Sequence, residues 1–325
     1  MSESVLNGAA TTSSSLAPPP GHSESAPRVA GAYLSHSEDA PVRRRTVLGD
    51  YREILGGLRQ CRDLITQLAL RDIRIRYKQA VFGFAWALLI PMSVVLAGML
   101  IRGAVAYASG HHVDSSQMGS MAVKAVPWAF FVGCLSMGTA SLIANMSLLT
   151  KIYFPREVLP LASVIAQSFD SLIGGVLLTL VLPFLGVTPS LQLLWVPVLL
   201  ALLWILGLAA ALFLSCANLF FRDVKYLVQV FLTFGIFVTP VVLDAPMFGP
   251  VGSRVIMLNP VAPLLEGLRL SIIEHHNLLQ PMLAPAGFLF WRPWYLLYGA
   301  SWALGGLLIG AIVFHRAERR FAEVA

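Results

Sequence analysis

The sequence predicts an all-α integral membrane protein with six transmembrane helices, an N-terminal amphipathic interfacial helix, and an external re-entrant helical segment between helices five and six. Of its 325 residues, 57% are hydrophobic and only 12% are charged, whereas soluble domains average about 25% charged residues. The charges stand between long uncharged runs. Basic residues flank these runs, so the net charge of +6 favours membrane orientation over nucleic-acid binding.

The N-terminal part of the chain divides into a tail and a helix. Residues 1–40 are rich in Ser, Ala, Pro and Gly and lack an apolar run, which predicts a disordered cytoplasmic tail over residues 1–50 rather than a signal peptide. In residues 51–78, Ile54, Leu58 and Ile65 recur at helical spacing, with basic residues on the opposite side. Such a helix lies in the membrane interface. The alternative is a soluble amphipathic helix packed on another domain.

Six apolar runs follow, in which Asp170 is the only charged residue, and they define a permease domain over residues 79–320. Each is long enough, or nearly so, to cross a hydrocarbon core of about 30 Å: 79–101, 125–150, 158–185, 191–219, 226–243 and 293–315. Pro91 is expected to kink the first run. A polar turn at 186–190 separates the third from the fourth. Residues 321–325 form the C-terminus.

The basic residues predict the orientation of these spans. With the N-terminus in the cytoplasm, 18 of the 23 basic residues fall inside and five outside. The positive-inside rule therefore predicts an even number of spans with both termini in the cytoplasm. Residues 244–292 are apolar but broken by prolines, and we expect two short helices that dip into the outer leaflet. Such structure is tolerated where it is buried in protein or lines a cavity, so we place an external gate there.

Missing motifs limit the functions that the chain can perform alone. The sequence has no Gly-x-x-x-x-Gly-Lys-Ser/Thr, no Asp-x-Asp and no His-Glu-x-x-His. We therefore predict no catalytic residue, no metal site and no cofactor in this chain, and an energy source in a partner. Two histidine pairs are interpreted as parts of solvated loops rather than metal ligands: His111–His112 and His275–His276.

Two further features are candidates for function. Asp170 is the one charge deep in a predicted span, and it serves either as a hydrogen-bond partner between helices, with Ser168, Ser171 or another helix, or as part of a substrate path. The short cytoplasmic segment 149–157 mixes aromatic and charged side chains beside a proline, which suits docking into a partner's groove. Its candidate docking residues are Lys151, Tyr153, Phe154, Pro155, Arg156 and Glu157. Residues 218–225 are a second candidate contact, and either segment alone is equally well an interfacial aromatic belt.

Four segments resemble the type-2 group of ABC transporter permeases that export polysaccharides. They are residues 71–78 followed by 82–86 and Pro91, residues 151–157 followed by Leu159–Pro160, residues 218–224, and residues 258–260 followed by Pro263 and Glu266. In that family they correspond to the start of the first span, two cytoplasmic loops and the external re-entrant segment. The resemblance extends from about Tyr51 to Arg320.

The resemblance implies a transporter subunit rather than an enzyme. It implies a homodimer bound to two separately encoded ABC ATPase subunits, which would hold ATP and Mg. The implied substrate is an undecaprenyl-linked polysaccharide of the O-antigen, teichoic acid or galactan type. The alternative is an ABC permease that exports a drug or another lipid. A membrane glycosyltransferase is disfavoured because the external acidic residues have no paired spacing: Asp114, Asp244, Glu266 and Glu274.

Three groups of residues receive roles on this reading. The residues expected near the pyrophosphate headgroup are Arg71, Arg76, Tyr77 and Lys78, although orientation by positive charge alone is an equal alternative. The aromatic residues proposed to line a channel are Phe130, Phe131, Phe234 and Phe237, with lipid-facing or core packing as the alternative. The external gate is assigned to Asn259, Pro260, Glu266 and Arg269.

Overall fold

Helices dominate the computed structural model, which describes residues 47–78, 85–109, 115–151 and 154–324. The α-helices are α1 (Val47–Gln60), α2 (Arg62–Tyr77), α3 (Ala85–Ser109), α4 (Ser115–Ala144), α5 (Met146–Lys151), α6 (Val158–Val181), α7 (Trp195–Phe220), α8 (Val224–Val238), α9 (Gly249–Ile256), α10 (Ala262–Ile272) and α11 (Trp294–Val324). The 3₁₀ turns are η1 (Leu182–Leu185), η2 (Leu191–Leu194) and η3 (Ala245–Phe248). The only two strands of the described residues, β1 (Met282–Leu283) and β2 (Leu289–Trp291), form an antiparallel hairpin. The largely helical class is confirmed, and the hairpin was not predicted.

Four helical stretches of the described chain are long and apolar enough to cross a bilayer. They are Gln117–Ala144, Val158–Leu185, Leu191–Phe220 and Trp294–Glu318, while the apolar stretches Pro91–Ala104 and Val224–Val238 are shorter. The predicted fifth span, 226–243, ends as a helix at Val238, and Thr239 is extended. The following residue, Pro240, disfavours helical backbone at Thr239. The count of six spans stays a prediction.

The predicted interfacial helix is two helices rather than one. Helix α1 begins at Val47, inside the predicted tail. The predicted single helix is interrupted at Cys61, between α1 and α2, because the ψ of 16° at this residue departs from helical geometry. Helix α1 packs on α11, whereas α2 packs on α6. Gly57 permits close packing near the break, because a Cβ there would lie 2.8 Å from Pro155 Cγ. Residues 1–46 and 79–84 lie outside the described residues.

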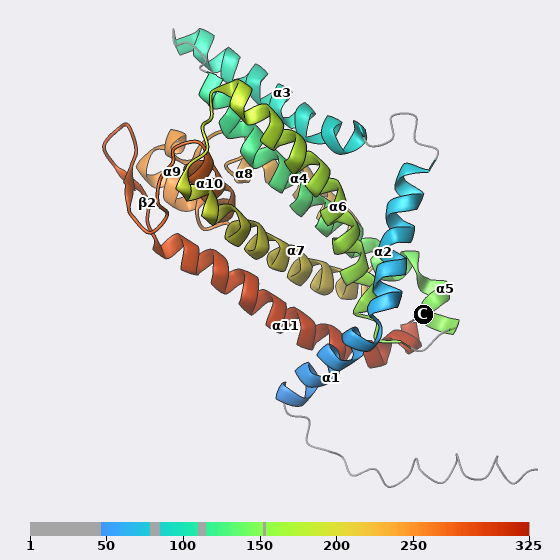
Figure 1. Cartoon of the computed structure of the whole chain (residues 1–325). Coiled ribbons are helices and arrows are strands. Elements are labelled where there is room, and N and C mark those ends of the chain that lie inside the picture. Colours follow the sequence, from blue (N-terminus) through green and yellow to red (C-terminus); the bar gives the residue numbers. More distant parts are fainter. Residues whose placement is uncertain (1–46, 79–84, 110–114, 152–153, 325) are drawn as a thin grey trace, which may run out of the picture. The chain divides into compact units, whose positions relative to one another are not determined.

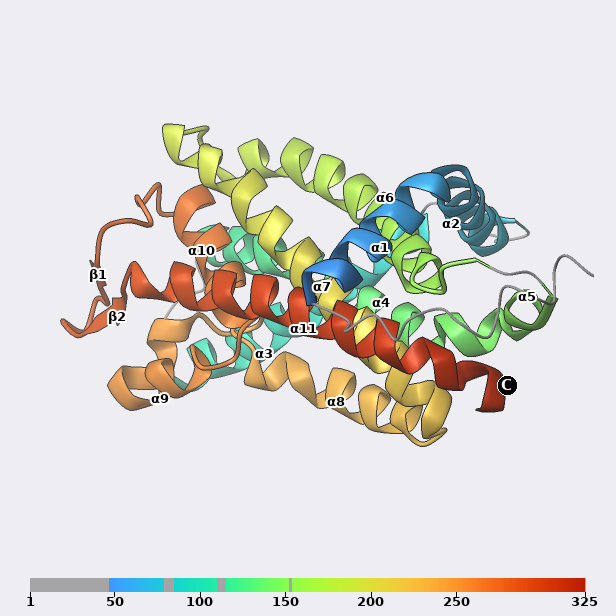
Figure 2. The same ribbon diagram turned by 90° about the horizontal axis from the view of Figure 1, so that it is seen from below.

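Helices α4 and α7 form the centre of the bundle. Helix α7 packs on α4 and α11, and α4 also packs on α3, α6 and α8. The elements α9, α10 and the hairpin gather at one end of the bundle, which we call the hairpin end; α1, α2, α5 and the end of α11 lie at the other (Figures 1 and 2). The N-terminal helices and the C-terminal helix end thus share one side, as an even number of crossings requires.

The segment between α8 and α11 contains the two short helices expected for residues 244–292, namely α9 and α10. All residues of α10 are buried, and this helix packs on α4, α7 and α11. At 1.5 Å per residue it is about 16 Å long, too short to cross a bilayer. Burial in protein is the condition under which such short elements are tolerated at membrane depth.

Two charged residues lie inside helices rather than in the external loop where the sequence placed them. Helix α3 continues past the predicted end at residue 101, and α4 begins before the predicted start at residue 125. Arg102 and Lys124 are therefore helical, and they are buried with 4% and 0% of their surface exposed. Both pair with Asp244, which compensates the cost of removing their charges from water.

Candidate functional site

A polar contact joins the end of α2 to the middle of α6. The Tyr77 hydroxyl donates to Asp170 Oδ1 at 2.5 Å, and Arg76 forms an ion pair with the other carboxylate oxygen. Arg76 Nη1 also donates to Gln167 Oε1 at 3.1 Å. Burial raises the pKa of Tyr77, so the phenol keeps the proton that it donates. Asp170 is thus a partner between helices, but its partners come from α2 rather than from neighbouring serines.

A cavity of about 540 Å³ lies beside this contact. Its polar side is made by Arg76, Tyr77, Gln167 and Asp170, and the remainder comes mainly from apolar residues of α3, α4 and α8, including Pro91, Val94, Val126, Trp128, Val132, Leu232 and Ile236. A charged rim on an apolar space suits an amphipathic ligand, because the two parts of such a ligand find matching surroundings.

The other two predicted headgroup residues lie apart from the cavity. Arg71 donates from Nη2 to Asp72 Oδ1 at 2.8 Å and to Asn145 Oδ1 at 2.7 Å, so it ties α2 to the end of α4. Lys78 is exposed at the end of α2. The structure therefore brings Arg76 and Tyr77 together at one cavity, and separates Arg71 and Lys78 from it.

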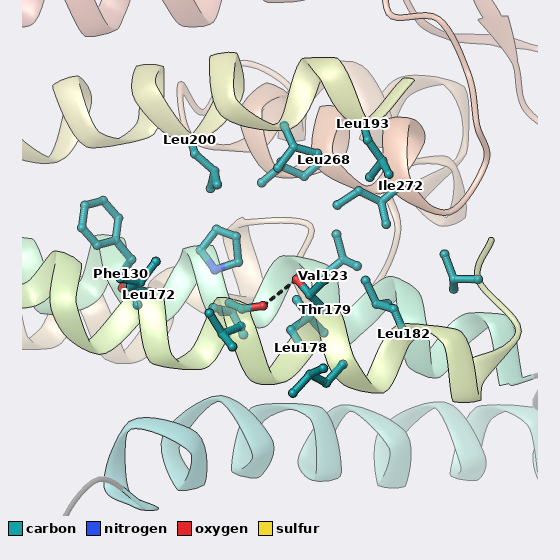
Figure 3. Close-up of a pocket in the computed structure, with 18 of the residues that line it drawn as sticks. Val123, Phe130, Leu172, Leu178, Thr179, Leu182, Leu193, Leu200, Leu268 and Ile272 are labelled. Atoms are coloured by element: carbon teal, nitrogen blue, oxygen red, sulfur yellow. Dashed lines mark hydrogen bonds between the residues drawn. The ribbon is translucent and has the colours of Figure 1, made fainter. Parts of the chain in front are cut away.

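A second, larger hollow of about 720 Å³ is almost wholly apolar and lies between α4, α6, α7 and α10. Figure 3 shows Phe130, Leu172, Leu200 and Leu268 around it. Phe130 lines this hollow, and only 6% of the Phe130 surface is exposed. The mainly apolar lining suits hydrocarbon, and two of its few hydroxyls, Ser168 and Thr179, already donate to backbone carbonyls of α6.

The four aromatic residues assigned to a channel do not form one wall. Phe131 is buried and packs against Trp128, with ring centroids 6.1 Å apart. Phe234 and Phe237 are 61% and 62% exposed on α8. Burial leaves Phe130 and Phe131 too little free surface to line a pore in this conformation, so core packing describes them better. The channel role of Phe234 and Phe237 stays a prediction.

The segment before α6 is attached to α11 instead of standing free. The Arg156 backbone N–H donates to Glu318 Oε1 at 3.1 Å, and the Arg156 guanidinium lies over the Phe321 ring at 5.6 Å. The buried Glu157 carboxylate lies 3.0 Å from His315 Nδ1. Phe154 is only 7% exposed, so it is a core residue and not an exposed docking anchor as predicted.

The remaining docking candidates of this region are partly described. Pro155 is half-buried against Gly57 of α1. The Lys151 side chain and Tyr153 lie outside the described residues. At the second candidate contact, between α7 and α8, Phe221 is 70% exposed beside the exposed Arg222 and Asp223, so this corner offers the free aromatic surface that Phe154 lacks.

At the hairpin end of the bundle, charges from four parts of the chain meet in a buried cluster. Asp244 accepts hydrogen bonds from Lys124 Nζ at 2.5 Å, Ser120 Oγ at 2.6 Å and Arg102 Nη2 at 3.0 Å. Arg269 pairs with Glu266 at 2.8 Å and with Glu274 at 2.9 Å. Lys124 also lies 3.9 Å from Glu266 Oε2. The cluster connects α3, α4, the start of η3 and α10.

The electrostatics of this cluster favour the charged forms of Asp244 and Arg269. Burial alone would raise the pKa of Asp244, but Lys124, Arg269 and Arg102 hold this pKa well below its usual range. Burial lowers the pKa of Arg269, but Glu266 and Asp244 more than compensate and raise it. The sequence identified Glu266 and Arg269, and missed Arg102, Lys124 and Asp244. Their only sequence signal was that each interrupted an apolar run.

The last two predicted gate residues shape the turn before α10. Asn259 Nδ2 donates to Thr239 Oγ1 at 2.9 Å, and Asn259 Oδ1 accepts from the Val261 N–H at 3.1 Å. Pro260 follows, half-buried. These contacts tie the end of α8 to the start of α10. They make the turn a structural element, and its gating role stays a prediction.

Comparison with known proteins gives no matching family model, but it gives relatives along most of the chain. A Klebsiella pneumoniae protein described as the O-antigen export system permease protein RfbA is 25% identical over 267 residues, which cover 81% of this chain and 95% of that protein. The chain is a homologue of O-antigen export permeases. A Myxococcus xanthus permease of the same description is 28% identical over 221 residues, covering 67% of this chain and 83% of the relative.

These relatives confirm the resemblance that the sequence motifs indicated, namely to type-2 ABC permeases of O-antigen export. Together with the apolar helices, they identify this permease homologue as a multi-pass membrane transport protein.

Proposed function

We propose that this permease homologue is the membrane subunit of an ABC exporter that moves a lipid-linked O-antigen-type polysaccharide across the bacterial inner membrane. ATP hydrolysis in a separate subunit drives the movement. Two copies of the chain and two ATPase subunits form the working complex, with six crossings per chain and both termini in the cytoplasm. The observation that carries this proposal is similarity over 81% of the chain to a protein named an O-antigen export permease.

The cavity beside Arg76 is the proposed entry point for the head of the carrier lipid. A diphosphate would compete with Asp170 for the Arg76 guanidinium, because phosphate and carboxylate oxygens suit the same planar donors. Tyr77 would keep its hydrogen bond to Asp170 and hold that carboxylate away from the diphosphate. The apolar side of the cavity, made by α3, α4 and α8, would receive the first part of the lipid chain.

The segment 154–157 is the proposed route by which the ATPase moves the helices. Arg156 and Glu157 contact α11, and Pro155 lies against α1. Force applied to this segment would therefore move the start of α6 together with both neighbours. The exposed corner at Phe221 and Arg222 offers a second docking surface for the ATPase.

Deletion of the gene, followed by complementation, tests the proposal. Undecaprenyl-linked glycan is expected to accumulate inside the deletion strain, and surface glycan to disappear. In the deletion strain, the Arg76→Gln variant should support an export rate about 10- to 100-fold lower than wild type does. The reason is that a charge-assisted hydrogen bond contributes about 1.5–3 kcal/mol. Arg74→Gln is the control, since Arg74 is exposed on the same helix. Without glycan accumulation in the deletion strain, the proposed cargo is wrong.

A further inference from the structure

Acidic side chains and a histidine gather at the end of the bundle that holds α1 and the end of α11. Glu157 precedes α6, and His315 and Glu318 lie on α11. The spacing of three residues places His315 and Glu318 on the same helix face. Glu53 of α1 completes the surroundings of the histidine. This cluster could not be predicted from the sequence, because its members come from three separate segments.

The distances between the potential ligand atoms suit a metal ion. His315 Nδ1 lies 3.0 Å from Glu157 Oε1 and 3.8 Å from Glu318 Oε2. One ligand atom from each of the three residues lies within 4.8 Å of the other two. A tetrahedral zinc ion with bonds of about 2.0–2.2 Å separates its ligand atoms by about 3.4 Å. Shifts of an ångström or less would therefore bring all three atoms into bonding distance of one ion.

The second ring nitrogen of His315 gives independent support. The side chain is only 10% exposed, and Nε2 is buried without a hydrogen-bond partner among the described residues. Glu53 Oε2 lies 3.8 Å from Nε2. A metal on Nδ1 would fix the proton on Nε2, and Glu53 would accept a hydrogen bond from this N–H after a small side-chain movement. Metal-binding histidines usually donate their other N–H to a carboxylate in this way.

The neighbouring charges leave suitable oxygens facing the histidine. Glu318 Oε1 already accepts from the Arg156 backbone N–H, so Oε2 is the oxygen directed at His315. The Arg156 guanidinium approaches Oε1 only to 3.9 Å. Two carboxylates, 4% and 22% exposed, therefore lie close together beside one imidazole. A cation between them would relieve their mutual repulsion.

We propose that Glu157, His315 and Glu318 bind a zinc ion, with Glu53 orienting the histidine from outside the coordination sphere. One imidazole with two carboxylates suits zinc better than magnesium, which prefers oxygen ligands alone. Water would complete the tetrahedral coordination. The ion would fasten the segment before α6 to the end of α11. This inference concerns metal binding by the chain itself and is independent of the exported cargo.

Zinc binding by the purified full-length chain in detergent tests the proposal. After treatment with EDTA, the protein is titrated with zinc chloride, and bound zinc is measured by mass spectrometry and calorimetry. We expect one tightly bound zinc per wild-type chain and a higher melting temperature with zinc. His315→Gln, whose amide can still donate to Glu157, should lose this zinc, and Glu318→Gln should lose it too. Glu53→Gln should bind about 10-fold more weakly.

His276→Gln is the matched control, because His276 lies 3.0 Å from the Gln280 carbonyl oxygen in a separate loop. It should bind zinc and respond to it as wild type does. Melting curves without zinc establish that each variant is folded. The proposal is overturned if wild type binds no zinc, or if binding is unchanged in both His315→Gln and Glu318→Gln.

Discussion

Asp244→Asn tests how strongly the buried ion cluster stabilises the hairpin end of the bundle. The substitution preserves shape and removes one charge, which leaves Arg102, Lys124 and Arg269 facing only Glu266 and the partly exposed Glu274. The Lys124 and Arg102 side chains are 0% and 3% exposed, so water cannot replace the lost partner. Breaking a buried ion pair on one side costs about 3–5 kcal/mol. A loss of this size lowers the melting temperature by roughly 10 °C in a chain of a few hundred residues.

Thermal unfolding of the purified protein in detergent, followed by tryptophan fluorescence, measures this loss. Asp223→Asn is the control, because Asp223 is exposed between α7 and α8 and should change stability by no more than about 0.5 kcal/mol. Adding Lys124→Met to Asp244→Asn should recover part of the loss, since it removes an unpaired buried cation. Equal melting temperatures of Asp244→Asn and wild type would contradict this role of the cluster. So would a double variant in which Lys124→Met lowers the melting temperature by as much as it does in the wild-type chain.

Two further substitutions probe other parts of the fold, and the pH dependence of stability probes Asp244 again. Arg156→Ala should destabilise the chain by about 1–2 kcal/mol, through the lost hydrogen bond and ring contact with α11, while Arg222→Ala should leave the melting temperature unchanged. Gly138→Val should prevent folding, because a Cβ there would lie 2.4 Å from the Cβ of the facing alanine on α7. Gly175→Ala is the control and should be tolerated, because a Cβ at Gly175 would have no neighbouring atom within 4 Å. Equal yields of the two folded variants would contradict this packing. The lowered pKa of Asp244 means that its contribution is present above the usual value of about 4 and is lost only as pH falls well below it. The difference in unfolding free energy between wild type and Asp244→Asn should therefore be constant from about pH 5 to 8. This difference should disappear in strong acid.

The long apolar helices could be predicted closely, because their limits are local. The predicted spans 158–185 and 191–219 correspond to the helical stretches Val158–Leu185 and Leu191–Phe220. The turn between them contains Gly186 with φ of 80°, a conformation that glycine adopts without strain. Length, hydrophobicity and turn residues were sufficient here because each acts within a few residues of the boundary that it determines.

The charge clusters could not be predicted, because their members are far apart in the sequence. Lys124 and Arg102 are 120 and 142 residues from Asp244, and Tyr77 is 93 residues from Asp170. Without its partner, a charge beside an apolar run predicts only the end of a span. Phe154 was misjudged for a related reason: an aromatic residue beside charges is equally consistent with an exposed anchor and a core residue, and only tertiary packing distinguishes them.

These long-range polar contacts have a particular role in a bundle surrounded by lipid. Apolar helix faces gain little from meeting each other there, because lipid chains are as apolar as leucine side chains. Directional contacts and close approaches must then determine which helices become neighbours. Asp244 does this between α3, α4 and η3, and Asp170 does it between α2 and α6. Between α4 and α7, Gly138 allows backbone to approach backbone. The polar residues that interrupt the apolar pattern therefore specify the arrangement of helices that the pattern alone leaves open.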